Sequence, residues 1–150
     1  MAITASYLPS PEGAERDPSA YVPELSRRAR GFATWAMIRQ LGREGIAAMV
    51  DEHCRIARHM AERLAAVPGV ELVCPVELNQ FMVRFGGADA ATLATVRQVQ
   101  DDNVAFIGAA QWRGQWVMRV SVSSVATTMA EADVTVDAVI SAWERVAEVE

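Results

Sequence analysis

The sequence contains no lysine, and its fourteen basic residues are all arginines. Without a side-chain amine, the chain cannot itself form the Schiff base that a lysine makes with a carbonyl group. Nineteen acidic residues give it a formal net charge of -5. An acidic chain with few basic clusters is a poor candidate for binding nucleic acid or an anionic membrane, so we expect neither partner.

Cysteine and histidine are also scarce, with two residues of each. Cys54 and Cys74 lie outside any Cys-x-x-Cys or Cys/His ligand spacing, which argues against a zinc site and against a disulfide framework. His53 and His59 fall on opposite sides of the helix expected there, so they cannot share a metal ion. We therefore expect no metal site, and two free thiols in a reducing compartment.

Motifs of self-contained active sites are missing as well. The chain has no Gly-rich phosphate loop, no Gly-x-Ser-x-Gly elbow and no His-Glu-x-x-His pair. The first residues lack the charged and apolar regions of a signal peptide, and no apolar run approaches the length of a membrane span. These absences lead us to expect a soluble, cytoplasmic protein.

The domain organisation follows from composition and periodicity. Residues 1–25 hold four of the six prolines, which predicts an irregular loop, and residues 26–150 have the length of a single domain. Apolar residues at helical spacing predict helices over 27–41, 43–67, from 89 and from 128. Alternation and short apolar runs predict strands over 70–74, 79–85, 104–107 and from 115. The sequence thus predicts an α+β fold, a small antiparallel sheet of about four strands packed by helices.

Several residues mark the expected helix boundaries and surfaces. Gly42 is expected to break the first helical stretch, Asp89 to cap the third helix, and Thr128 to begin a capping box on the fourth. On the long second helix, Asp51 and Arg55 are expected to form an i,i+4 pair.

The strand that starts at Gln115 carries the residue with the most distinctive chemistry. Its core face alternates with a face on which Arg119 lies between Val117 and Ser121. An arginine at this place is either a solvated strand residue or an anion-binding residue, because a guanidinium matches a carboxylate in two parallel hydrogen bonds. Spacing alone leaves both interpretations open.

Two long runs in the sequence resemble a known family. The run LSRRARGFATWAMIRQLGREGI begins at Leu25, and the run WRGQWVMRVSVSSVATT begins at Trp112. Together they resemble the C-terminal part of the pyridoxal-phosphate-dependent group II amino-acid decarboxylases, such as the aromatic-L-amino-acid and glutamate decarboxylases. The resemblance extends from Tyr7 to the last helix, and it implies the C-terminal domain of the aspartate aminotransferase fold, fold type I.

The resemblance implies roles for three residues. Tyr7 is similar to the mobile-loop tyrosine that protonates the substrate carbon after carbon dioxide leaves, and that reaches into the neighbouring subunit. Arg119 is similar to the arginine that binds the region of the substrate carboxylate, and Ser26 occupies a position near the cofactor phosphate across the dimer interface. An amino-acid substrate, pyridoxal phosphate and a homodimer are therefore implied.

The chain differs from this family in having no lysine. In the family, the Schiff-base lysine lies upstream of the segment matched here. We therefore expect a C-terminal fragment, or one half of a split decarboxylase whose partner is the upstream half. Such a chain would be inactive alone and would not bind pyridoxal phosphate covalently. The alternative is a stand-alone α+β module for ligand binding or dimerisation, without catalysis. Truncation also predicts exposed apolar residues on the helix over 31–41.

Overall fold

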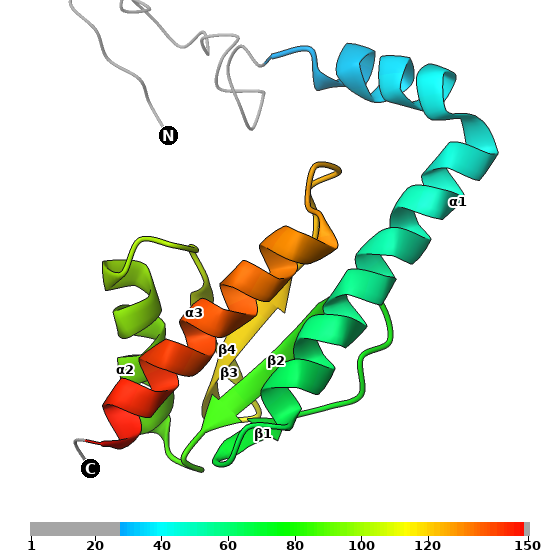
Figure 1. Ribbon diagram of the computed structural model, residues 1–150. Coiled ribbons are helices and arrows are strands. Elements are labelled where there is room, and N and C mark those ends of the chain that lie inside the picture. Colours follow the sequence, from blue (N-terminus) through cyan, green and yellow to red (C-terminus); the bar gives the residue numbers. More distant parts are fainter. Residues whose placement is uncertain (1–27, 149–150) are drawn as a thin grey trace, which may run out of the picture. The chain divides into compact units, whose positions relative to one another are not determined.

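The computed structural model describes residues 28–148, so the loop predicted over 1–25 lies outside the described residues. The elements follow the predicted order, with the first two predicted helices joined into one kinked helix. They are α1 (Arg30–Ala65), β1 (Val70–Leu72), β2 (Gln80–Phe85), α2 (Asp89–Asp101), β3 (Gly108–Trp112), β4 (Gln115–Ser121) and α3 (Met129–Ala147) (Figure 1).

The four strands form one antiparallel sheet in the order β1-β2-β4-β3. The chain leaves β2, passes through α2 and enters β3, and only then returns as β4 between them. The predicted α+β class, with a four-stranded antiparallel sheet packed by helices, is confirmed. β4 is consequently a central strand with a hydrogen-bonded neighbour on each side.

A two-residue turn sets the register of β3 against β4. Arg113 and Gly114 have φ values of 50° and 80°, as a type I′ hairpin turn requires of both its central residues. Counting back from this turn places Gly108 opposite Arg119. The strand predicted over 104–107 is therefore wrong, because β3 starts only at Gly108, and the carbonyl of Ile107 instead accepts a hydrogen bond from Gln100 Nε2 at 2.8 Å.

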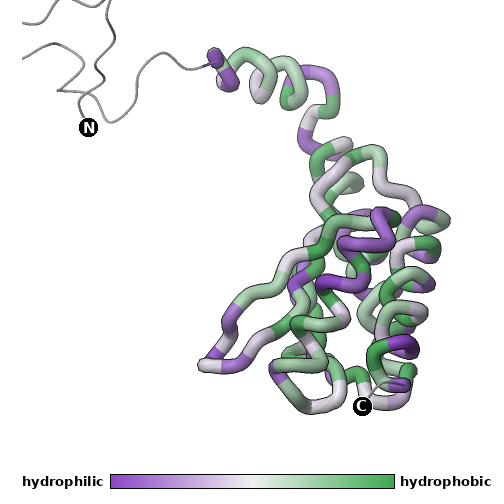
Figure 2. The backbone as a smooth tube through the Cα atoms, turned by 90° about the vertical axis from the view of Figure 1, so that its left-hand side faces the viewer, coloured by the Kyte–Doolittle hydropathy of each residue, from purple (hydrophilic) through white to green (hydrophobic). Residues whose placement is uncertain are grey.

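The hydrophobic core lies between one face of the sheet and the three helices. Buried residues of α2, α3 and the part of α1 after Gly42 join the inward residues of β2 and β4 in a single cluster. Green and purple alternate along the helices in Figure 2, as expected for helices that bury one side. The predicted inward residues of β2 and β4 are buried except for Trp116, which is half-buried; the buried ones are Phe81, Val83, Phe85, Met118 and Val120.

The chain divides at Gly42 into two units, residues 1–42 and 43–150. The predicted break is confirmed, because Gly42 has φ 63° and ψ -171° inside α1, a conformation that is essentially restricted to glycine. In the described part of the first unit, Phe32, Trp35 and Ile38 are exposed, as predicted for the helix over 31–41. The rings of Phe32 and Trp35 lie 6.0 Å apart.

Two of the predicted helix details are wrong and one is confirmed. The N-cap of α2 is Ala88 rather than Asp89, whose carboxylate has other partners. Arg55 pairs with Glu52, one turn back at i,i+3, instead of Asp51. The capping box on α3 forms as predicted, with Thr128 at the N-cap.

Candidate functional site

Arg119 lies in the middle of β4, on the sheet face that alternates with the core face. Its backbone neighbours are Met82 of β2 and Gly108 of β3. The side chain is exposed, and no residue between 28 and 148 forms a hydrogen bond or an ion pair with it. The structure therefore places an exposed guanidinium on a strand that is hydrogen-bonded to a neighbouring strand on each side. Whether it binds an anion stays a prediction.

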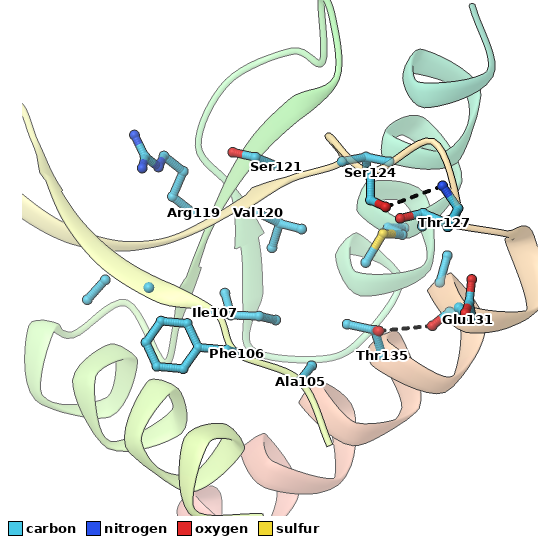
Figure 3. Close-up of a pocket in the computed structure, with 16 residues that line it drawn as sticks. Ala105, Phe106, Ile107, Arg119, Val120, Ser121, Ser124, Thr127, Glu131 and Thr135 are labelled. Atoms are coloured by element: carbon cyan, nitrogen blue, oxygen red, sulfur yellow. Dashed lines mark hydrogen bonds between the residues drawn. The ribbon is translucent and has the colours of Figure 1, made fainter. Parts of the chain in front are cut away.

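A cavity of about 460 Å³ lies beside Arg119. Figure 3 shows it between the start of β3, the end of β4 and the first turns of α3. Arg119 and Phe106 lie toward one end, and Ser124, Thr127, Glu131 and Thr135 toward the other. The volume is within the range of sites that bind small molecules.

The two ends of the cavity differ in chemistry from its middle. Ile107 and Val120, both buried, contribute apolar side chains to the middle. At the far end the Thr135 hydroxyl donates to the carbonyl of Glu131 at 2.9 Å, and the Ser124 hydroxyl accepts from the Ala126 backbone N–H at 3.3 Å. The cavity therefore joins a hydroxyl-lined end to an apolar middle, and Arg119 lies at the other end, on the sheet face opposite to that of its neighbour Val120.

Glu131 is the only acidic residue among the described cavity residues, and the capping box holds it. The Thr128 backbone N–H donates to Glu131 Oε2 at 2.7 Å and lowers the pKa of this carboxyl below its ordinary value, and the Thr128 hydroxyl adds to the effect. The carboxylate is therefore ionised at neutral pH. It lies at the opposite end of the cavity from Arg119 (Figure 3).

Sequence reasoning missed a polar contact that fixes the start of β4. Asp89 Oδ1 accepts from Arg84 Nη2 at 2.9 Å and from the backbone N–H of Trp116 at 3.1 Å. Arg84 alternates with the inward residues of β2, yet it is only 8% exposed. The carboxylate thus ties β2 and the first turn of α2 to β4, the strand that carries Arg119. Alternation could not reveal it, because the three residues meet only in the folded sheet.

Polar residues also join α1 to α3 and to the loop beside the cavity. His53, which is buried, donates from Nε2 to the carbonyl of Ser124 at 3.1 Å. His59 Nε2 lies 2.6 Å from Asp133 Oδ1, and Arg63 donates to the same oxygen at 2.8 Å. Both histidines thus have structural partners. Within residues 28–148, no three His, Cys, Asp or Glu side chains are placed to hold a metal ion.

Two of the three predicted site residues, Tyr7 and Ser26, lie outside the described residues. Of the three, the structure therefore places Arg119 alone. Phe106, which the sequence suggested only as part of a strand, is instead a cavity residue. The two-residue turn of the hairpin could have located β3, because residues 108–112 directly precede it.

Comparison with protein families gives a match to the pyridoxal-dependent decarboxylase conserved domain over residues 1–86. This match covers more than half of the 150 residues. The chain belongs to the pyridoxal-dependent decarboxylase family. The matched region includes Tyr7 and Ser26 and ends with β2, so Arg119 lies beyond it. A comparison with curated proteins found no match.

Solved structures of decarboxylases have a similar fold. Oryza sativa TDC with PLP and tryptamine superposes with a TM-score of 0.73 at 16% identity, over 86% of this chain and 29% of that one. Catharanthus roseus tryptophan decarboxylase in complex with L-tryptophan gives 0.71 at 12% identity, over 88% and 32%. Lactobacillus brevis glutamate decarboxylase gives 0.67 at 14% identity, over 77% and 27%. The chain therefore spans about a third of these proteins or less, and it matches their C-terminal portion.

Among residues 28–148, no helix combines the length and the apolar character that crossing a bilayer requires. The side chains present do not fit a covalently held pyridoxal group, because all fourteen basic residues are arginines and none can form a Schiff base.

Proposed function

We propose that this chain forms the C-terminal portion of a pyridoxal-phosphate-dependent amino-acid decarboxylase, in which Arg119 binds the substrate carboxylate. The observation that carries the proposal is an exposed guanidinium at one end of a cavity, on the central strand of a family member. In this reading the portion contributes substrate binding. The bond-breaking chemistry belongs to the cofactor, held elsewhere in the protein.

The local structure suits Arg119 to this role. β4 is hydrogen-bonded on both sides, so the backbone that carries the guanidinium is positioned more rigidly than a loop would allow. Its neighbour in β3 is Gly108, which has no side chain to cover the guanidinium. A carboxylate that accepts two parallel hydrogen bonds from this fork would be fixed in orientation as well as in place.

The absence of lysine supports a chain that is inactive by itself. The proposal therefore gives the chain no covalent contact with the cofactor, and no turnover unless the rest of the enzyme is present. Tyr7 as proton donor and Ser26 near the cofactor phosphate belong to the same proposal, and both rest on the family resemblance. A cytoplasmic homodimer, with Tyr7 reaching the neighbouring subunit, completes the arrangement that we infer.

Decarboxylation measured in two forms of the protein tests the proposal. The 150-residue chain alone, mixed with pyridoxal phosphate and amino acids, is expected to release no carbon dioxide and to retain no cofactor absorbance after dialysis. The same chain, extended upstream to include a Schiff-base lysine, is expected to decarboxylate. In this longer form Arg119→Gln should lower kcat/KM about tenfold to a hundredfold, because a hydrogen bond to a charged group contributes about 1.5–3 kcal/mol.

Arg113→Gln is the matched control, since it removes the same charge from the turn that precedes β4. Equal losses in the two variants would exclude a specific role for Arg119. Carbon dioxide release by the short chain alone would overturn the proposal. Tight amino-acid binding by the short chain, lost in Arg119→Ala while the extended form stays inactive, would identify a stand-alone binding module instead.

A further inference from the structure

We propose that β3 pairs with β3 of a second copy of this chain, edge to edge and antiparallel, so that the sheets of the two copies join into one. β3 ends the sheet, since β4 is its only hydrogen-bonded neighbour among the described strands. The inference goes beyond the proposed function and is independent of it, because the pairing involves neither a cofactor nor an amino acid.

The outer edge of β3 presents free backbone groups at alternate residues. The pair that flanks the two-residue turn, Trp112 and Gln115, is hydrogen-bonded across the hairpin, and from there every second pair is. Ala109 and Gln111 lie between these pairs, so their N–H and C=O groups point away from β4. No residue between 28 and 148 forms a hydrogen bond with these outward groups.

A contact on the other side of β4 agrees with this order. Trp116 lies opposite Gln111, and its backbone N–H donates to Asp89 at 3.1 Å instead of to β3. The backbone groups of Trp116 and Gln111 thus point away from each other, as the residues of a pair that is not hydrogen-bonded do. The open groups of β3 are therefore a consequence of the hairpin register.

The two edges of the sheet differ in how they are protected. Proteins usually block pairing at an edge with a very short strand, a charged side chain, a proline or a bulge. β1 has only three residues, and the exposed Glu71 is the middle one. β3 has five residues without charge or proline, and its register against β4 runs without a bulge. Of these two edges, β3 is therefore the one suited to the addition of a strand.

A second copy of β3 matches this edge by symmetry and by charge. In the antiparallel register centred on Ala110, Ala109 of each copy lies opposite Gln111 of the other, which brings the outward backbone groups together. A two-fold axis through the Ala110 pair relates the copies, so the same segment forms both halves of the interface. Two copies with a net charge of -5 repel each other overall, and an uncharged strand is where contact costs least.

The same register places the largest side chain of β3 against its glycine. Trp112 of each copy comes opposite Gly108 of the other, on the face that alternates with the core face. Trp112 is 40% exposed, and an added Cβ on Gly108 would have nothing within 4 Å, so space for an indole ring is present. An aromatic ring that covers a glycine at a strand edge stabilises the pairing.

Phe106, two residues before β3, extends the contact surface. Its side chain is 88% exposed, and in an antiparallel pair the chain before β3 runs toward the hairpin turn of the other copy. Large aromatic side chains bury about 150–250 Å² each, so covering Phe106 and Trp112 in both copies removes about 500 Å² from water. A specific interface needs about 1,000 Å² in total, and the paired strands add to the area of the rings. We therefore expect a reversible dimer of moderate affinity.

Amide hydrogen exchange of the isotope-labelled 150-residue chain, measured by NMR in dilute and in concentrated solution, tests the pairing at single residues. Sedimentation velocity on the same samples gives the oligomeric state. As the dimer forms, exchange at Ala109 and Gln111 should slow at least about tenfold. Exchange at Ala110, which is bonded to β4, should be slow at every concentration. A chain that stays monomeric, or exchange at Gln111 that does not change with concentration, would overturn the inference.

Substitutions at the edge separate the backbone from the side chain. Gln111→Pro removes an outward N–H without removing a hydrogen bond to β4, and it should weaken the dimer at least about tenfold. Gln111→Ala is the matched control, because it keeps the N–H and should leave the dimer unchanged. Trp112→Ala should weaken the dimer about tenfold through loss of the ring. If circular dichroism shows that Gln111→Pro does not fold, Gln111→Lys replaces it, since a charge at the edge also opposes pairing.

Trp35→Ala distinguishes β3 from the exposed apolar residues of the helix over 31–41. This variant should dimerise like the wild type. A dimer that persists in the Gln111 edge variant and dissociates in Trp35→Ala would assign the contact to that helix and overturn the inference. Neither result bears on the role of Arg119, which is tested separately by decarboxylation.

Discussion

Replacing Gly69 by alanine is expected to destabilise the domain mainly through a clash with Trp143. Gly69 has φ +80°, and a Cβ added there would lie 2.7 Å from Trp143 Cζ2. The indole ring has little freedom to move away. It is 7% exposed, its Nε1 donates to the carbonyl of Pro68 at 2.9 Å, and its centroid lies 5.6 Å from that of Phe85. Something in this cluster must therefore shift.

The expected loss in the free energy of unfolding has two parts, and a matched variant can distinguish them. Alanine in a left-handed conformation costs about 1–2 kcal/mol in the free energy of unfolding, whatever surrounds it. Overpacking of a close-packed core adds about 1–3 kcal/mol. Gly87 has φ +66° but nothing within 4 Å of an added Cβ, so Gly87→Ala carries only the first cost. Gly69→Ala should thus lose about 2–5 kcal/mol, out of a typical total of about 5–15 kcal/mol.

Urea denaturation followed by circular dichroism at 222 nm measures both variants. The expected result is a loss in Gly69→Ala that exceeds the loss in Gly87→Ala by about 1–3 kcal/mol. Repeating the pair in a Trp143→Leu background should remove most of this difference, because the atom that clashes is gone. Equal losses in the wild-type background, or a difference that survives removal of the indole, would refute the reasoning.

Two further predictions concern polar contacts and the helix break. The hydrogen bond from His59, and then that from Arg63, lowers the pKa of Asp133 below its ordinary value of 3.8. Asp133→Asn should therefore reduce stability at neutral pH, and the difference from wild type should vanish as the pH falls below that value in denaturation curves. Gly42→Ala should extend the helix through the break, because alanine disfavours φ 63° with ψ -171°. Helical Cα chemical shifts at residues 40–44 would show the extension, Gly31→Ala should leave the break in place, and unchanged shifts in Gly42→Ala would contradict the prediction.

Local patterns in the sequence were sufficient for most of the fold. The alternation of Phe81, Val83 and Phe85 identified the buried face of β2, and the spacing of Thr128 and Glu131 identified the start of α3. Each of these features depends on neighbours within a few residues along the chain, either through side-chain period or through capping. The family resemblance, carried by two runs of residues, is confirmed by the conserved-domain match.

Two of the errors arose where contacts between residues distant in the sequence outweigh a local preference. Residues 104–107 have the composition of a strand, yet the register set by the hairpin turn gives that role to Gly108–Trp112. Asp89 has the position of a helix cap, yet Arg84 and the Trp116 amide take its carboxylate. In both places the local preference is weak, and long-range hydrogen bonding decides the outcome.

The sequence by itself determined the order of the elements, the faces that they bury and the absence of any side chain able to form a Schiff base. These properties follow from covalent identity and from periodicity, which do not depend on folding. Only the tertiary structure decided that Phe106 and Arg119 share a cavity, thirteen residues apart along the chain. The pairing of β3 with β4 fixes that arrangement, because it sets which side chains meet across two strands.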